Sequence, residues 1–207
     1  MIKSAVALLL ALALAACTTI YRREGDELVG ERLAVHVSQA WNKVSDPWNV
    51  DPYETWTQDG LPLDTLRLWG GLRPGQPLMT KDAVFSRAAD ARDPRVPTFQ
   101  AGLGPEKLVS LFEELYATKG TVNITRVEPA MFAGHKGVRF EFTLARRADD
   151  LDMRGVGWFA VRSDPIWGEE LYAATFVAPK LAFFDRLLPM AEAVVKTARI
   201  QPPPKKT

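Results

Sequence analysis

Hydrophobic and polar residues alternate most clearly in the second half of the chain. In residues 137–146 every second position is apolar, namely Val138, Phe140, Phe142 and Leu144. A period of two places these side chains on one face of a strand, as an antiparallel sheet with one covered side requires. The same reasoning predicts further strands over residues 121–128, 153–162 and 170–177.

The first half of the chain predicts shorter strands. Residues 33–37 alternate at period two, and residues 54–58 and 63–69 flank Asp59-Gly60, a strong hairpin signal. Pro62 weakens the start of the second strand of this hairpin. Residues 70–103 begin with a stretch rich in glycine and proline, which predicts a long connection with at most one short helix, around 81–89.

Two longer segments have helical patterns. Residues 105–119 start with proline, carry apolar side chains about one turn apart and precede Gly120, a typical helix cap. Residues 180–197 predict a closing helix, in which Pro189 would produce a kink or delay the start. We therefore expect an α+β fold, with a single antiparallel β-sheet and helices packed against it, similar to an α/β/α sandwich.

The order of elements over residues 32–200 resembles the PsbP-like α/β/α sandwich family. Its members share a strand pair, a helix before a run of antiparallel strands, and a terminal helix ending in a short apolar motif, here Phe183-Phe184 to Ala198-Arg199-Ile200. The resemblance implies a non-enzymatic assembly factor or binding module. It is one of topology, so no family site is carried over to residues of this chain.

The first 17 residues have the pattern of a secretory signal. Lys3 precedes an apolar run over residues 4–14, and Leu14-Ala15-Ala16-Cys17 follows it. This segment resembles the lipobox of bacterial lipoproteins. The resemblance implies a signal peptide over residues 1–16, and a Cys17 that carries a diacylglycerol thioether and an acyl chain such as palmitate on its new amine. An ordinary signal peptide or an uncleaved anchor remains open, although the run is shorter than the roughly 20 residues that span a bilayer.

The same resemblance predicts a location. Thr18 stands where an aspartate would resemble an inner-membrane retention signal, so we expect a lipid-anchored protein in the outer membrane that faces the periplasm. We expect a lipidated tether over residues 17–31, one domain over 32–201, and a flexible tail rich in proline and lysine over 202–207.

Composition narrows the possible partners. Cleavage before Cys17 would remove Lys3 and no acidic residue, which leaves 25 basic and 25 acidic side chains. A neutral chain without a polybasic stretch favours neither nucleic acid nor electrostatic membrane binding, so the expected membrane contact is the lipid on Cys17. The single cysteine excludes a disulfide within the chain and a zinc–thiolate site.

Few residues indicate chemistry. His36 falls in a predicted strand and His135 in a predicted loop, and no Gly-x-Ser-x-Gly motif accompanies them. The aspartates at 149, 150 and 152 lack the glycine and the closing glutamate of an EF-hand loop. We therefore expect no enzymatic activity, no metal and no cofactor.

Tryptophans gather in one segment. Four lie within 29 residues, accompanied by Tyr53: Trp41, Trp48, Trp56 and Trp69. In one interpretation these rings cover the sheet; in the other, Trp48, alone or with Tyr53, lines a groove for an envelope protein, glycan or lipid. The candidate binding residues are Trp48 first, then Tyr53, Trp41 and Trp56.

Two functions remain open. The first is an envelope lipoprotein with a non-enzymatic binding or assembly-accessory domain and an envelope protein as partner. The second is a periplasmic module that binds a small lipid or glycan. An exposed flat aromatic patch would favour the first, and a cavity beside the connection over residues 70–103 would favour the second.

Overall fold

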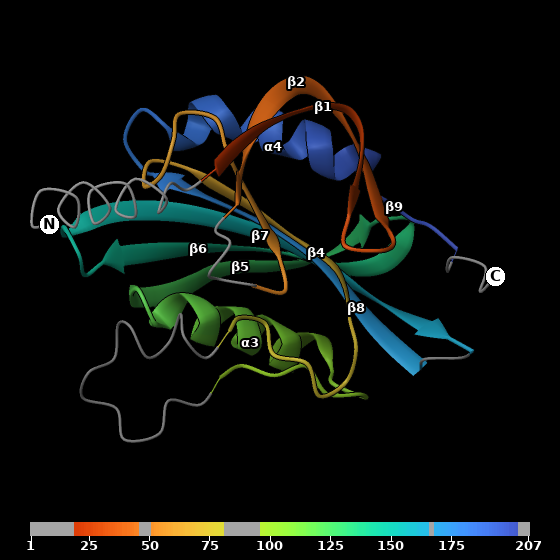
Figure 1. Ribbon diagram of the computed structural model, residues 1–207. Coiled ribbons are helices and arrows are strands. Elements are labelled where there is room, and N and C mark those ends of the chain that lie inside the picture. Colours follow the sequence, from red (N-terminus) through yellow and green to blue (C-terminus); the bar gives the residue numbers. More distant parts are fainter. Residues whose placement is uncertain (1–18, 46–50, 81–95, 166–167, 203–207) are drawn as a thin grey trace, which may run out of the picture.

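The computed structural model describes residues 19–45, 51–80, 96–165 and 168–202 (Figure 1). Its helices are α3 (Pro105–Ala117) and α4 (Phe184–Thr197). Its strands are β1 (Thr19–Val29), β2 (Leu33–Ser45), β3 (Glu54–Thr57), β4 (Thr65–Leu72), β5 (Gly120–Phe132), β6 (His135–Arg146), β7 (Leu151–Asp164), β8 (Gly168–Pro179) and β9 (Arg199–Ile200).

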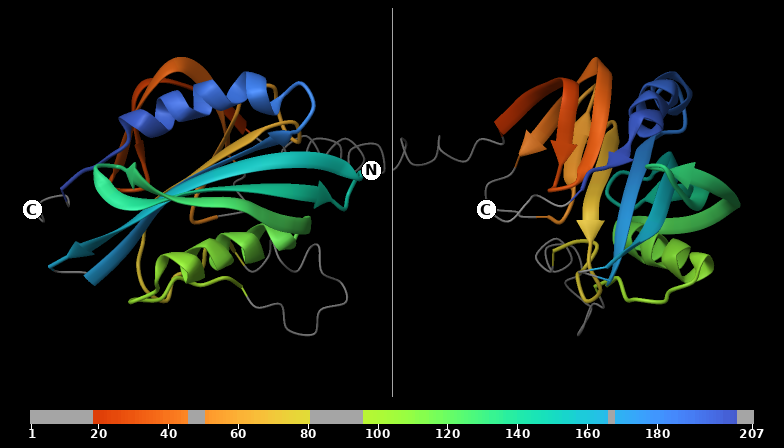
Figure 2. Two further views of the ribbon diagram at one scale, coloured as in Figure 1. Left: turned by 180° about the vertical axis from the view of Figure 1, so that it is seen from behind. Right: turned by 90° about the vertical axis from the view of Figure 1, so that its right-hand side faces the viewer.

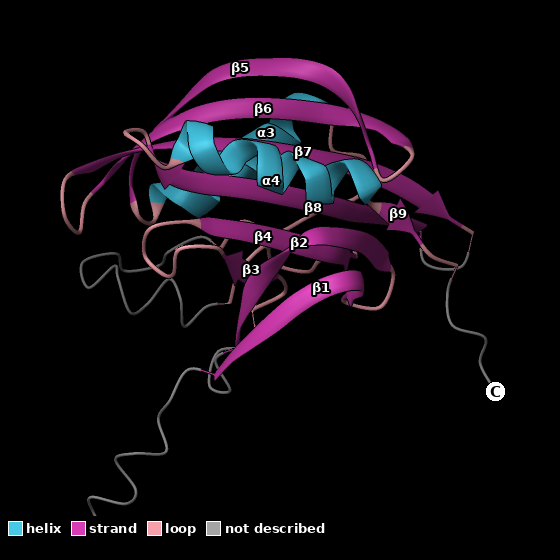
Figure 3. Ribbon diagram, turned by 90° about the horizontal axis from the view of Figure 1, so that it is seen from above, coloured by secondary structure: helices cyan, strands magenta, loops and turns pink. Residues whose placement is uncertain are grey.

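The strands form one antiparallel sheet in the order β1-β2-β3-β4-β8-β7-β6-β5, and β9 pairs with β2. Every neighbouring pair on this path is consecutive in sequence except β4 and β8, which join the two halves of the sheet. Figure 3 shows β1 and β5 on opposite sides of the sheet, where they form its two edges. The central strand β8 is buried on both faces over most of its length.

One helix lies on each face of the sheet (Figure 2). On one face, Phe184, Leu187 and Ala191 of α4 belong to a buried cluster with residues of β2 and β8. On the other face, Phe112 of α3 stacks at 5.8 Å from Phe159 in a second cluster. The alternating apolar residues of β6 point into this second cluster, as their period of two predicts.

Several predicted elements are confirmed. The hairpin around Asp59-Gly60 connects β3 to β4, and Gly60 has a φ of 96°. The predicted helix over 105–119 is α3, and the four predicted strands of the second half are β5 to β8. The closing helix begins at Phe184 and contains Pro189. The short helix expected around 81–89 lies outside the described residues.

The prediction of an α/β/α sandwich was wrong. Strands make up 56% and helices only 17% of the described residues, so the fold is mainly a nine-stranded sheet. The helices are short, with 13 residues in α3 and 14 in α4. Loop residues complete the core on the side of α3, where Leu78, Met79 and Phe99 are buried in one cluster with the side chains of that helix.

The predicted tether over residues 17–31 differs from the structure from Thr19 onward. Residues Thr19–Val29 form β1, which pairs with β2 from Thr19 opposite Ser45 to Val29 opposite Leu33. The hydrophobic pattern did not reveal this strand, because an edge strand can carry charged side chains in place of an apolar face. In β1 these charges form ion pairs such as Arg22–Glu24 and Arg23–Glu27. The folded domain therefore begins at Thr19 and not near residue 32.

Candidate functional site

The predicted binding residues lie in different places. Cys17 and Trp48 are outside the described residues. Trp41 and Trp56 are 0% exposed and belong to the core cluster under α4, where Trp41 meets Phe176 edge-on at 6.4 Å. A fully buried ring offers no surface to a partner, so these two tryptophans are core residues. Tyr53 is only partly buried.

Tyr53 lies against a buried cation. The guanidinium of Arg67 is 4.9 Å from the ring of Tyr53 and 5.5 Å from that of Tyr116. Burial opposes the charge of Arg67, but Tyr53, Tyr116 and Asp51 outweigh it and raise the pKa of Arg67. Burial also raises the pKa of Tyr53 above its usual range. The Nε of Arg67 has no hydrogen-bond partner within the described part of the chain.

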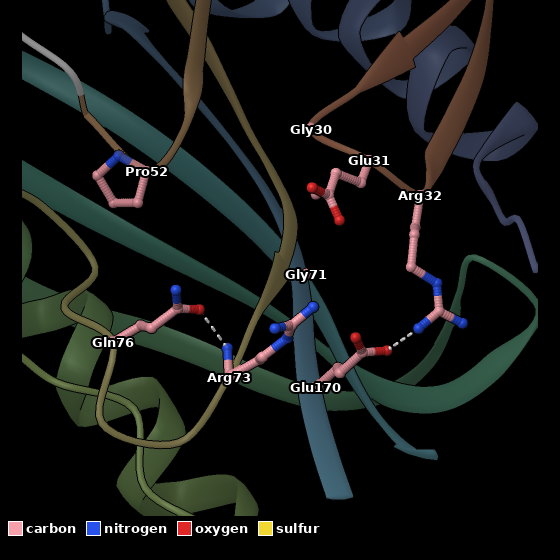
Figure 4. A pocket seen from close by; sticks show the side chains of 9 residues that line it. Gly30, Glu31, Arg32, Pro52, Gly71, Arg73, Gln76 and Glu170 are labelled. Atoms are coloured by element: carbon pink, nitrogen blue, oxygen red, sulfur yellow. Dashed lines mark hydrogen bonds and ion pairs between the residues drawn. The ribbon is translucent and has the colours of Figure 1, made fainter. Parts of the chain in front are cut away.

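A pocket opens where β3 stops. The pair Glu54–Leu68 is the last between β3 and β4, while β4 continues to Leu72. Just before β3 lies Pro52, which has no amide hydrogen with which to extend the ladder. A pocket of about 250 Å³ lies beside the remainder of β4, between Pro52, the β1–β2 turn, residues 70–76 and Glu170 (Figure 4).

Glycines form the floor of this pocket. A Cβ on Gly70 would lie 2.2 Å from the carbonyl oxygen of Val29, so any side chain there would collide with the β1–β2 turn. Gly71 has a φ of 114°, a conformation that side-chain-bearing residues rarely adopt. The pairing with β8 is also irregular between Gly70 and Leu72. Both glycines line the pocket and are only partly buried, so part of the β4 main chain borders it.

A buried ionic network fixes one wall. Arg32 Nη1 donates to Glu170 Oε2 at 2.5 Å and to Asp164 Oδ2 at 3.3 Å, and Arg32 Nε donates to the carbonyl of Gln201 at 3.0 Å. The hydroxyl of Tyr172 donates to the same Glu170 oxygen at 2.8 Å. Burial and this hydrogen bond raise the pKa of Tyr172. The side chains of the three charged residues are at most 3% exposed.

The charged residues that line the pocket balance one another in number. Arg32 and Arg73 face Glu31 and Glu170, and Gln76 Oε1 accepts a hydrogen bond from the amide of Arg73 at 2.6 Å. Equal numbers of cations and carboxylates favour a ligand with both donors and acceptors and no large net charge. The volume is below the roughly 300–1,000 Å³ of drug-sized sites, so the pocket fits a fragment-sized polar group.

Sequence reasoning missed these residues, although two left a signal. Glu170 shares the phase of Tyr172 and Phe176 along β8, and Arg67 stands between Leu66 and Leu68 in a buried strand. A charged residue in the core-facing phase of a strand indicates a buried ion pair or a site. Arg32 left no comparable signal, since it lies in a turn.

The histidines form no catalytic group with each other. His36 Nδ1 lies 2.8 Å from Asp26 Oδ1, and both side chains are largely exposed. His135 pairs with Phe132 at the β5–β6 hairpin. Within the described ranges, no three histidine, cysteine or acidic residues gather as metal ligands would. Helices in the same ranges are too short or too polar to cross a membrane.

Comparison with solved structures gives only a weak likeness. No protein family matches the sequence, and no curated protein matches it. The crystal structure of LpqN, involved in cell envelope biogenesis of Mycobacterium tuberculosis, matches 91% of this chain and 87% of its own, with 8% identity and a TM-score of 0.42. At this level of similarity, no property of LpqN is transferred to this chain.

Proposed function

We propose that this chain is a lipid-anchored, non-enzymatic binding protein of the bacterial cell envelope, with its domain in the periplasm and its anchor in the outer membrane. One observation carries the proposal. The lipobox pattern ends at Cys17, and the sheet begins at Thr19. A signal and modification site directly before a folded domain is the organisation that a lipoprotein needs, and several acyl chains hold such a protein stably.

The described side chains support a binding role over catalysis. The buried charges of Arg32, Glu170 and Asp164 are engaged with one another, which suits a rigid wall better than proton transfer. The exposed His36 has an aspartate beside it, but it is not among the residues that line the pocket. An assembly or stability accessory of the envelope needs no more chemistry than this.

Cell fractionation tests the anchor. We expect the wild-type chain to incorporate an alkyne-labelled palmitate and to sediment with outer membranes, whereas Cys17→Ser loses both properties. Thr18→Asp is the matched control, because it keeps the lipid and should move the protein to the inner membrane where the retention rule holds. A wild-type chain that remains soluble and unlabelled would contradict the proposal.

Cross-linking in intact cells tests for a protein partner. A photoreactive amino acid at position 48 should give a discrete protein adduct. The control is position 181, where Leu181 is 82% exposed at the start of the α4 region. Adducts of equal yield at both positions, or none at 48, would argue against a partner bound through this segment.

A second function, binding of a small envelope ligand, is favoured by the pocket beside β4. Its bordering main chain and balanced charges suit a polar unit of a glycan or peptide. We would measure thermal shifts with N-acetylglucosamine and D-alanyl-D-alanine. A shift in the wild-type chain that disappears in Glu31→Gln and Arg73→Ala would support this function. Equal shifts in all three proteins would count against it.

A further inference from the structure

We propose that the first residues of β1 lie in the head-group layer of the membrane and hold the domain against the bilayer in a fixed orientation. The partner is a lipid surface, and the contact consists of Ile20, Tyr21 and Arg22. This inference rests on the proposed lipidation of Cys17. It goes further because it states which surface of the domain meets the membrane.

Chain length brings β1 to the membrane. Each residue spans at most about 3.6 Å, so Thr19 lies within about 7 Å and Ile20 within about 11 Å of Cys17. The head-group region on each side of a bilayer is about 5–8 Å thick. A lipid-bearing Cys17 therefore places the start of β1 in or directly above this region.

The strand leaves no room for a flexible spacer. Thr19 and Ile20 are already paired with Ser45 and Val44 of β2, and the register continues through Arg23 opposite Trp41. Since Trp41 is 0% exposed, this part of the hairpin is fixed to the core. Only Thr18 separates the lipid-bearing Cys17 from the sheet, and this short link limits the rotation of the whole domain.

The exposed side chains at this end have the chemistry of a membrane interface. Ile20 is 62% and Tyr21 49% exposed, and they are adjacent. The side chain of Arg22 is 72% exposed, and its guanidinium pairs with the neighbouring Glu24, a contact that lipid phosphates would replace. Aliphatic side chains prefer the boundary of the acyl chains, tyrosine side chains prefer the head-group level, and arginine side chains prefer the lipid phosphates. Beyond Arg22, exposed Glu24 and Asp26 would be repelled by anionic lipids, which confines the contact to the first residues.

The opposite edge of the sheet lies away from the proposed contact. Seven strand-to-strand steps separate β1 from β5, which at about 4.8 Å each amount to at most about 34 Å. Val127 on β5 is 49% exposed and thus matches Tyr21 in exposure but not in position. It provides an internal control for distance from the bilayer.

Site-specific fluorescence quenching tests the orientation. Cys17 is the only cysteine, and its lipid blocks it, so an introduced cysteine can be labelled selectively. We would label Ile20→Cys and Val127→Cys with the fluorophore NBD and reconstitute the lipidated chains into phosphatidylethanolamine–phosphatidylglycerol vesicles with head-group spin labels. We expect at least threefold stronger quenching and a blue-shifted emission at position 20. Equal quenching at both positions in lipidated protein would overturn this inference and leave the proposed function standing.

Two additional measurements separate the possible failures. Mass spectrometry of the same samples establishes whether Cys17 carries lipid, and an unmodified cysteine would overturn both the proposed function and this inference. A 12-residue Gly/Ser spacer inserted between Thr18 and Thr19 adds about 19 Å of mean reach. The spacer should lower quenching at position 20 to the level at position 127. Unchanged quenching at position 20 would show that chain length does not set the orientation.

Discussion

Replacing Arg32 by methionine should severely destabilise the protein. The side chain of Arg32 is 2% exposed, and those of Asp164 and Glu170 are 3% and 2% exposed. Arg32→Met keeps most of the volume but leaves two carboxylates buried near each other without this cation. Removing one partner of a buried ion pair costs about 3–5 kcal/mol, which is a large share of the roughly 5–15 kcal/mol that stabilises a typical domain.

Urea unfolding of the full chain in detergent measures this cost. The control is Arg22→Met, because the Arg22–Glu24 pair is exposed and such pairs contribute about 0–1 kcal/mol. Neutralising both carboxylates with Asp164→Asn and Glu170→Gln in the Arg32→Met background should recover part of the loss, since no buried charge then lacks a counter-ion. A loss below about 1 kcal/mol in Arg32→Met, or no recovery in the triple variant, would refute the reasoning.

Three further predictions concern stability. Arg67→Met should lower the melting temperature, because it removes a buried cation whose charge is favoured by Asp51 and by the rings of Tyr53 and Tyr116; an unchanged or raised melting temperature would contradict this. Gly70→Ala should cost more than about 2 kcal/mol because its Cβ would collide with the main chain, whereas Gly104→Ala, with open space around it, should be near neutral in the same assay. The hydrogen bond from Arg146 lowers the pKa of Asp149 in the folded chain, so this pair stabilises the fold above the unfolded pKa of Asp149 and loses its effect as the pH falls. Unfolding of Asp149→Asn over a pH series should therefore show a difference in stability from wild type that shrinks towards low pH.

Much of the sheet could be predicted because its strands bury one face. The alternation of Phe140 and Phe142 with polar residues identified β6, and the helical stripe around Phe112 identified α3. In each case the hydrophobic period was visible because the element has one apolar and one polar face. The dipeptide Asp59-Gly60 identified the β3–β4 hairpin because its turn preference depends only on neighbouring residues.

The remainder of the fold depended on contacts distant in sequence. β1 has no apolar face, and only its pairing with β2 makes it a strand. Leu78 and Phe99 lie in loops, so no period showed that they would join the core on the side of α3. Arg32 and Glu170 are 138 positions apart, and their ion pair exists only because the β1–β2 turn meets the start of β8. The pocket was likewise invisible, since it arises where β3 ends.

The most direct test of the central claim is the mass of the N-terminal peptide of the protein isolated from bacterial membranes. We expect this peptide to begin at Cys17 and to carry a diacylglycerol and an amide-linked acyl chain. A peptide that begins before Cys17, or one with an unmodified cysteine, would contradict the lipoprotein assignment and the membrane orientation inferred from it.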